Sequence, residues 1–198
     1  MTGALVRAGL LLLALAGCRD EGAQVYGLSF GSFSASPVVV TRLAVNGQDF
    51  QPLPLLVDAR SDQVMPRANA GLYSQPLAAG RNGQVALELG WVELPTGRAF
   101  AADLQVPVQD LQRSGPDQVQ LAPIFGPNGL LLITSDPVPQ SADDQPIRDL
   151  AQLCAARSPG EDTDYRAAPD LLPDLANVLA EQRPGFDDPI CPEPEARP

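Results

Sequence analysis

The stretch VALELGWVELPTGRAFAADLQV, residues 85–106, alternates apolar and smaller side chains on both sides of a short turn. The alternating positions are Val85, Leu87, Leu89 and Trp91, then Phe100, Ala102, Leu104 and Val106. Gly97 in the turn can adopt the positive φ that such a connection requires. We interpret Trp91 and Phe100 as core residues rather than as a ligand platform. The stretch therefore predicts an antiparallel hairpin with one buried face.

Two further hairpins are predicted on either side of it. Residues 38–45 are rich in β-branched side chains and end at Asn46-Gly47, a strong hairpin signal. Residues 50–57 are the expected return, at a sheet edge because Pro52 and Pro54 cannot donate ladder hydrogen bonds. The third hairpin joins residues 118–125 to residues 130–135, whose apolar run predicts a strand covered on both faces. We expect the C-terminal segment to supply that cover.

Residues 58–76 show no sustained period and are predicted to be a long surface loop. Such loops are often functional, so this one is a candidate contact region. The alternative is an irregular excursion that covers the edge of the sheet.

The composition changes after the third hairpin. Residues 136–198 contain 14 acids and 5 arginines, with apolar stripes at helical spacing in 143–157 and 169–183. The expected fold is mainly β: an antiparallel sandwich-like body of six or seven strands, residues 25–135, with a short two-helix C-terminal segment packed on it. The tail beyond Cys191 is expected to be disordered.

Missing residue types exclude most catalytic centres. The chain of 198 residues has no His, and all 13 basic residues are Arg. Ser-His and Cys-His pairs, imidazole metal sites and lysine Schiff bases are therefore excluded. Residues 27–31, GLSFG, match the nucleophile-elbow pattern but lack a His base, so we interpret them as part of a strand. A carboxylate pair remains open, although no spacing singles one out. We expect no enzyme activity, cofactor or metal.

The net charge indicates which classes of binding partner suit the protein. The formal net charge of −11 is unsuited to nucleic acid, whose phosphates need clustered cations. It suits a protein partner with a basic patch, and it is equally compatible with a role in solubility alone.

The N-terminus has the pattern of an export signal. Arg7 precedes a short apolar run that is too short to span a membrane, and small residues follow it. The tetrad Leu15-Ala16-Gly17-Cys18 resembles the lipobox of bacterial lipoproteins. The resemblance implies a signal peptide over residues 1–17, cleavage between Gly17 and Cys18, and lipid attachment to Cys18. The alternative is an ordinary secretory signal with a chance cysteine.

The resemblance also implies a location. Residues 18–24 would form a short lipidated tether that holds the body close to a membrane. Arg19, rather than Asp, follows the cysteine, which favours the outer membrane over the inner one.

With Cys18 assigned to lipid, Cys154 and Cys191 remain as one pair in an oxidising compartment, where a disulfide is expected. The loop of about 37 residues that it closes corresponds to roughly 4 kcal/mol in the chain-entropy model.

The overall layout resembles small envelope lipoproteins, some of which are immunity proteins against antibacterial toxins. This resemblance implies a membrane-anchored, non-enzymatic protein-binding module. The alternative is a structural or assembly accessory of the cell envelope.

Overall fold

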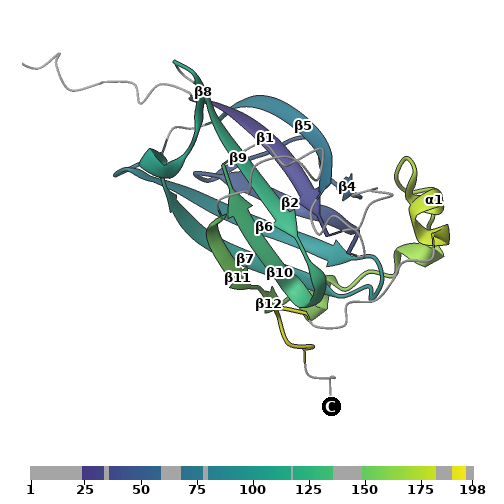
Figure 1. Cartoon of the computed structure of the whole chain (residues 1–198). Helices are drawn as coiled ribbons and strands as arrows, with labels where there is room; N and C mark the ends of the chain where they lie inside the picture. Colours follow the sequence, from purple (N-terminus) through teal and green to yellow (C-terminus); the bar gives the residue numbers. More distant parts are fainter. Residues whose placement is uncertain are drawn as a thin grey trace, which may run out of the picture.

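Two β-sheets, packed face to face, form the body of the protein in the computed structural model (Figure 1). The structure describes residues 24–33, 36–58, 68–77, 80–116, 118–135, 149–181 and 189–194, with the backbone alone at 68–72 and 114. Sheet A has the order β11-β10-β9-β1-β5, and β8 also pairs with β9. Its strands are β1 (Gln24–Ser32), β5 (Ala68–Leu77), β8 (Arg113–Gly115), β9 (Gln118–Phe125), β10 (Leu130–Thr134) and β11 (Asp149–Cys154).

Sheet B has the order β12-β7-β6-β2-β3, and β4 also pairs with β2. Its strands are β2 (Val38–Val45), β3 (Gln48–Asp49), β4 (Leu55–Val57), β6 (Gln84–Glu93), β7 (Ala99–Pro107) and β12 (Ala156–Arg157). Among the described pairs, only β1 and β9 run parallel. The predicted mainly β, sandwich-like class is confirmed. Within residues 24–135 the described strands number ten rather than six or seven, because short pieces and the long edge strand β5 join the predicted hairpins. Two more strands, β11 and β12, come from the C-terminal segment.

Aromatic side chains from both sheets fill the space between them. Trp91 of β6 stacks on Phe100 of β7 with ring centroids 5.9 Å apart, and lies 5.1 Å from the ring of Phe125 in β9. All three side chains are fully buried. Each such ring removes roughly 150–250 Å² from water. The interpretation of Trp91 and Phe100 as core residues is therefore confirmed.

The predicted hairpins form where their partners are close in sequence. Residues Val85–Val92 of β6 pair antiparallel with β7, with Trp91 opposite Phe100, and Gly97 has φ +69°. Asn46-Gly47 turns the chain between β2 and β3 with positive φ at both residues. The return after Phe50 is confined to β4, which pairs with β2 on the side away from β6. The two prolines precede it, as expected for an edge strand.

The prediction of a loop over residues 58–76 is wrong for its second half. Residues Ala68–Leu77 form β5, the edge strand of sheet A, paired antiparallel with β1. Gly71 and Pro76 made the strand hard to recognise in the sequence, because both residue types weaken a strand pattern. In the structure Pro76 is tolerated because β5 is an edge strand. Residues 59–67 lie outside the described part of the chain.

The predicted helix over 143–157 is also wrong. Residues Asp149–Cys154 form β11, which pairs antiparallel with β10 and extends sheet A. Leu150 and Leu153 have helical spacing in the sequence, but both pack against the central core from a strand. Tertiary pairing with β10 therefore overrides the local period. Residues 143–148 are outside the described range.

The predicted helix over 169–183 is reduced to α1 (Leu175–Ala180), which buries Leu175 and Val178. Pro173 lies just before it, at a position where a longer helix would lose a hydrogen bond. Three-residue 3₁₀ turns precede α1: η3 (Pro159–Glu161) and η4 (Tyr165–Ala167). Among the described residues of this segment, one short α-helix is present where two were expected.

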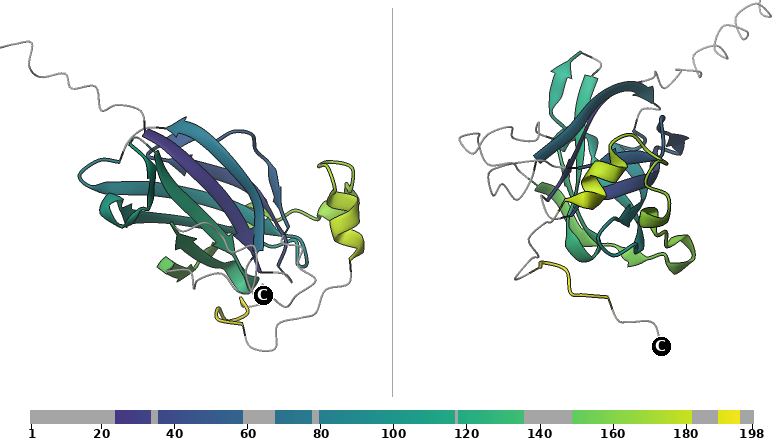
Figure 2. Two further views of the ribbon diagram at one scale, coloured as in Figure 1. Left: turned by 45° about the horizontal axis from the view of Figure 1, so that its top comes forward. Right: turned by 90° about the vertical axis from the view of Figure 1, so that its right-hand side faces the viewer.

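The C-terminal segment crosses from one sheet to the other and covers both (Figure 2). One residue, Ala155, separates β11 in sheet A from β12 in sheet B. Tyr165 and α1 then pack on the outer face of sheet B, against Val39 and Val92. Cys191 lies in a cluster on the outer face of β9 and β10. The expected cover of β10 is confirmed, and residues 155–181 and 189–194 are called the C-terminal strap below.

Candidate functional site

The sandwich has two ends with different chemistry, and β1 runs from one to the other. At the Gln24 end, β1 begins beside Leu77 of β5 and close to Gln118 of β9. At the Cys191 end, Phe33 follows β1 and packs in the same cluster as Cys191. Nine extended residues span about 30 Å. The two ends are therefore separate surfaces.

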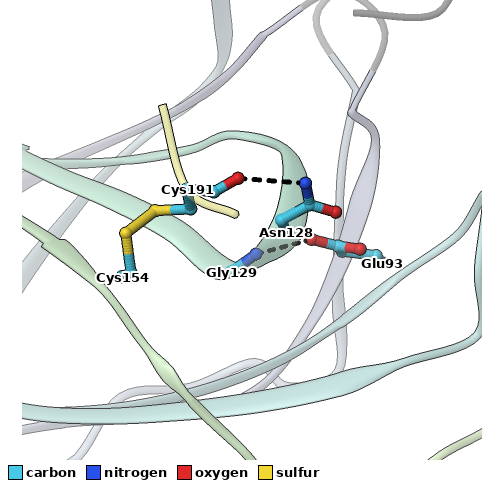
Figure 3. The surroundings of a disulfide bond; sticks show 5 residues. All are labelled: Glu93, Asn128, Gly129, Cys154 and Cys191. Carbon is cyan, nitrogen blue, oxygen red and sulfur yellow. Dashed lines mark hydrogen bonds between the residues drawn. A yellow bond between two sulfur atoms is a disulfide. The ribbon is translucent and has the colours of Figure 1, made fainter. Parts of the chain in front are cut away.

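The Cys191 end is closed by the predicted disulfide, which the structure shows between Cys154 and Cys191 (Figure 3). The S–S distance is 2.01 Å and the Cα–Cα distance 5.6 Å. Cys154 is exposed at the end of β11, opposite Leu130, whereas Cys191 is fully buried. The bond thus holds the end of the C-terminal strap on the outer face of sheet A.

A buried carboxylate lies beside this disulfide. Glu93, at the end of β6, is 3% exposed and accepts hydrogen bonds from the Gly129 N–H at 2.8 Å and the Thr96 hydroxyl at 3.0 Å. Burial raises the pKa of Glu93. The two hydrogen bonds, together with the positive charge of the nearby Arg98, partly offset this rise. Asn128 donates through Nδ2 to the Cys191 carbonyl at 3.1 Å. The two hairpin turns and the C-terminal strap are therefore joined at one junction (Figure 3).

The turn between β9 and β10 requires a glycine at this junction. Gly129 has φ +78°, and a Cβ atom there would lie 2.4 Å from the Phe100 ring. The residue before it, Asn128, also has a positive φ of 59°. The turn of the third predicted hairpin is thus confirmed, as the 3₁₀ turn η2 (Pro127–Gly129).

Ion pairs and backbone hydrogen bonds attach the C-terminal strap to β7 and the β6–β7 turn. Arg157 forms a two-pronged ion pair with Asp162, at 2.8 and 2.9 Å, and lies over the Phe100 ring at 5.2 Å. The same carboxylate accepts the Ala99 N–H at 2.8 Å. Further along the chain, Arg98 pairs with Glu193 at 3.2 Å. Both ends of the strap thus hold the same turn, and Asp162 has a structural role.

The outer surface of the C-terminal strap is acidic. Its exposed carboxylates outnumber its two arginines, Arg157 and Arg166, and one of these is already paired with Asp162. These exposed acids are Glu161, Asp162, Asp164, Asp170, Asp174, Glu181 and Glu193. Two large apolar side chains are exposed beside them, Leu171 at 59% and Ile190 at 54%. The surface can therefore bind a partner that offers cations and some apolar area.

The Gln24 end carries a polar pocket on sheet B, with a volume of about 300 Å³. It is lined by Asn46, Arg81, Asn82, Gln84, Ala86 and Gln105. Asn46 accepts the Ala86 N–H at 2.8 Å and donates to the Tyr26 hydroxyl at 3.3 Å, so its side chain is fixed. Because Tyr26 is the third residue of β1, this contact places the pocket near the start of that strand.

Sequence reasoning missed this pocket, although a signal was present. A second Asn-Gly pair, Asn82-Gly83, repeats the dipeptide at residues 46–47, and all four residues have positive φ. Gln84 closes this turn by donating its N–H to the Arg81 carbonyl at 2.9 Å. The two turns form much of the pocket wall.

The remaining sites considered in the sequence analysis are the lipid attachment site and the GLSFG match. Leu15, Ala16, Gly17 and Cys18 lie outside the described residues, so the lipid attachment remains a prediction. Ser29 of the GLSFG match lies within β1 and is buried.

In the described ranges, no helix is long and apolar enough to cross a membrane. Within the same ranges, no group of three or more His, Cys, Asp or Glu residues is placed to hold a metal ion.

Comparison with protein-family models, with curated proteins and with solved structures gives no match for this chain.

Proposed function

We propose that this chain is a lipid-anchored bacterial envelope protein that acts as a non-enzymatic, immunity-type protein-binding module. The lipid is attached to Cys18, and the protein faces the periplasm from the outer membrane. The partner carries a basic patch and binds the C-terminal strap.

The observation that carries the proposal is the separation of the two ends of the sandwich. Six residues lead from Cys18 to Gln24, which extended span about 20 Å. Acylation of Cys18 would therefore keep the Gln24 end at the membrane. Since β1 runs away from that end for about 30 Å, the Cys191 end would project from the surface. The acidic strap is thus on the side that a periplasmic partner reaches first.

Rigidity supports the same assignment. The disulfide, the Asn128 contact and the Arg157–Asp162 pair fix the C-terminal strap on the sandwich before any partner arrives. A surface ordered in advance loses less conformational entropy on binding. Its exposed carboxylates attract a basic partner over a distance comparable to the Debye length, about 8–10 Å at moderate salt.

The test uses crosslinking in cells to identify the partner, followed by affinity measurements with purified protein. The strap variant Glu161→Gln/Asp170→Asn/Asp174→Asn should lower the affinity at least about tenfold at low salt, since charged contacts contribute on the order of 1 kcal/mol each. The control, Asp49→Asn/Asp103→Asn/Asp110→Asn, makes the same charge change in the body and should have little effect. Equal losses in the two variants, or binding that does not weaken with salt, would refute the assignment to the strap.

A further inference from the structure

We propose that the polar pocket at the Gln24 end binds a phosphorylated polyol, with the glycerophosphate headgroup of a membrane phospholipid as its source. The choice of a lipid source rests on the proposed attachment of Cys18 to the membrane. The choice of ligand chemistry rests on the pocket alone.

The pocket is a fixed feature of the fold. Its wall is built from the turns at residues 46–47 and 82–83 and from the neighbouring strands β6 and β7, where Ala86 pairs with Gln105. Val108 donates its N–H to the Gly83 carbonyl at 2.9 Å, which ties the second turn to the end of β7. The backbone that carries the lining side chains is therefore fixed before a ligand enters.

The lining groups define the ligand class. The carboxamides of Asn82, Gln84 and Gln105 each offer both donors and an acceptor, as hydroxyl groups require. Arg81 adds a guanidinium, whose planar set of donors matches phosphate oxygens. Among the described lining residues there is no carboxylate, in a chain whose formal net charge is −11. A phosphate ester of a polyol offers hydroxyl groups to the carboxamides and phosphate oxygens to the guanidinium.

Neighbouring charges set the strength of binding. The next residue pair on the same face of sheet B is Glu88 and Asp103. Glu88 forms an ion pair with Arg42, which neutralises it. Asp103 is exposed and opposes an anionic ligand. The variant Asp103→Asn should therefore strengthen the binding of a phosphate ester.

The position of the pocket favours a lipid source over a free metabolite. An acylated Cys18 would hold the Gln24 end within about 20 Å of the bilayer. General electrostatic attraction cannot account for contact with anionic lipids, because the chain as a whole is acidic. Headgroup binding would thus require a specific pocket, and it would fix the rotation of the body on its anchor.

The experiment uses the full mature chain with Cys18→Ser, so that no acyl chain contributes. Binding of glycerol 3-phosphate, inorganic phosphate and glycerol is measured by calorimetry and by amide shifts of Gln84, Ala86 and Gln105. Binding to vesicles of phosphatidylcholine, with and without phosphatidylglycerol, is measured by sedimentation. Arg81→Gln should lower the affinity for glycerol 3-phosphate about tenfold. Arg113→Gln removes the same charge at the same end, outside the described lining, and should leave it unchanged.

Each result decides a part of the proposal. Equal losses in the two arginine variants, or no shift at the three amides, overturn the pocket site. Inorganic phosphate binding as tightly as glycerol 3-phosphate overturns the polyol component. Binding to glycerol 3-phosphate without binding to phosphatidylglycerol vesicles supports the ligand class and overturns the lipid source. None of these outcomes affects acylation of Cys18, which is tested separately.

Discussion

Glu93 and Gly129 come from different hairpins of different sheets, yet a 2.8 Å hydrogen bond joins the carboxylate of one to the backbone N–H of the other. This contact ties the end of β6 to the turn between β9 and β10. The same turn holds Cys191 through Asn128. The stability of the Cys191 end therefore depends on a few identifiable atoms.

Gly129→Ala should destabilise the protein strongly. The φ of +78° costs an alanine about 1–2 kcal/mol, and its Cβ would meet the Phe100 ring. The matched control is Gly83→Ala, where φ is +74° and no atom lies within 4 Å of the added Cβ. Urea unfolding should show a loss of about 1–2 kcal/mol for the control and a clearly larger loss for Gly129→Ala. Equal losses would show that Phe100 moves aside without cost.

The ionisation of Glu93 should make the folded state less stable as pH rises. Burial raises its pKa in the folded protein above the ordinary value of 4.5, so the folded state holds this proton more tightly than the unfolded state. The resulting stabilisation is complete below the unfolded pKa and is lost as pH rises through the folded pKa. Each unit of the rise corresponds to about 1.4 kcal/mol.

The variant Glu93→Gln tests this effect, because it keeps an oxygen acceptor for Gly129 and removes the charge. Its free energy of unfolding, relative to the natural protein, should increase between pH 4 and pH 8, as followed by urea titration (about the range in which a carboxyl with a raised pKa ionises). Glu93→Ala leaves the Gly129 N–H without this acceptor and should cost about 1–3 kcal/mol. A constant difference between Glu93→Gln and the natural protein across this range would show that Glu93 does not titrate differently on folding.

Loss of the disulfide should loosen the C-terminal strap more than the sandwich. In the double variant Cys154→Ser/Cys191→Ser, the free energy of unfolding should fall by roughly 4 kcal/mol in the chain-entropy model. Hydrogen exchange should rise first in α1 and around Cys191, and much less in β6 and β7. Uniformly faster exchange would contradict the separate role of the strap, and two free thiols in the exported protein would contradict the bond itself.

Cys18→Ser should prevent lipid attachment and abolish membrane anchoring. The natural protein is expected in the membrane fraction, where its precursor should accumulate when the lipoprotein signal peptidase is inhibited with globomycin. The variant should appear as a soluble periplasmic or uncleaved form. Unchanged fractionation of the variant, together with no response to globomycin, would show that Cys18 carries no lipid.

Local pairing explains which parts of the fold could be predicted from the sequence. The β6–β7 and β9–β10 hairpins join neighbouring runs, so alternation and turn residues were sufficient. The two longest missed strands, β5 and β11, lie at sheet edges and have weak local patterns. Pairing with a neighbouring strand, rather than a local pattern, determines their conformation. The partner of β5 is β1, and β2, β3 and β4 lie between the two in the sequence. Short apolar stripes such as Leu150 and Leu153 fit a helix and an edge strand equally well.

The candidate sites also differ in whether they could be predicted from the sequence. The Cys154–Cys191 bond followed from counting cysteines, since only one pairing remained once Cys18 was assigned. The role of Glu93 could not be predicted, because a single acid beside a turn has no distinctive spacing and its burial depends on Gly129 in another hairpin. The pocket depends on the meeting of two turns, of which only the dipeptides Asn46-Gly47 and Asn82-Gly83 are visible in the sequence.

The parallel pairing of β1 with β9 has a consequence for the order in which the body is completed. β1 lies inside sheet A, between β5 and β9, and its second partner becomes available only when the chain has emerged as far as Phe125. Contacts between residues so far apart in sequence slow folding. Until then, one edge of β1 presents unpaired backbone N–H and C=O groups with which other chains can pair. A newly synthesised chain would therefore need protection from aggregation during this interval, although β1 is the first of the described strands to be synthesised.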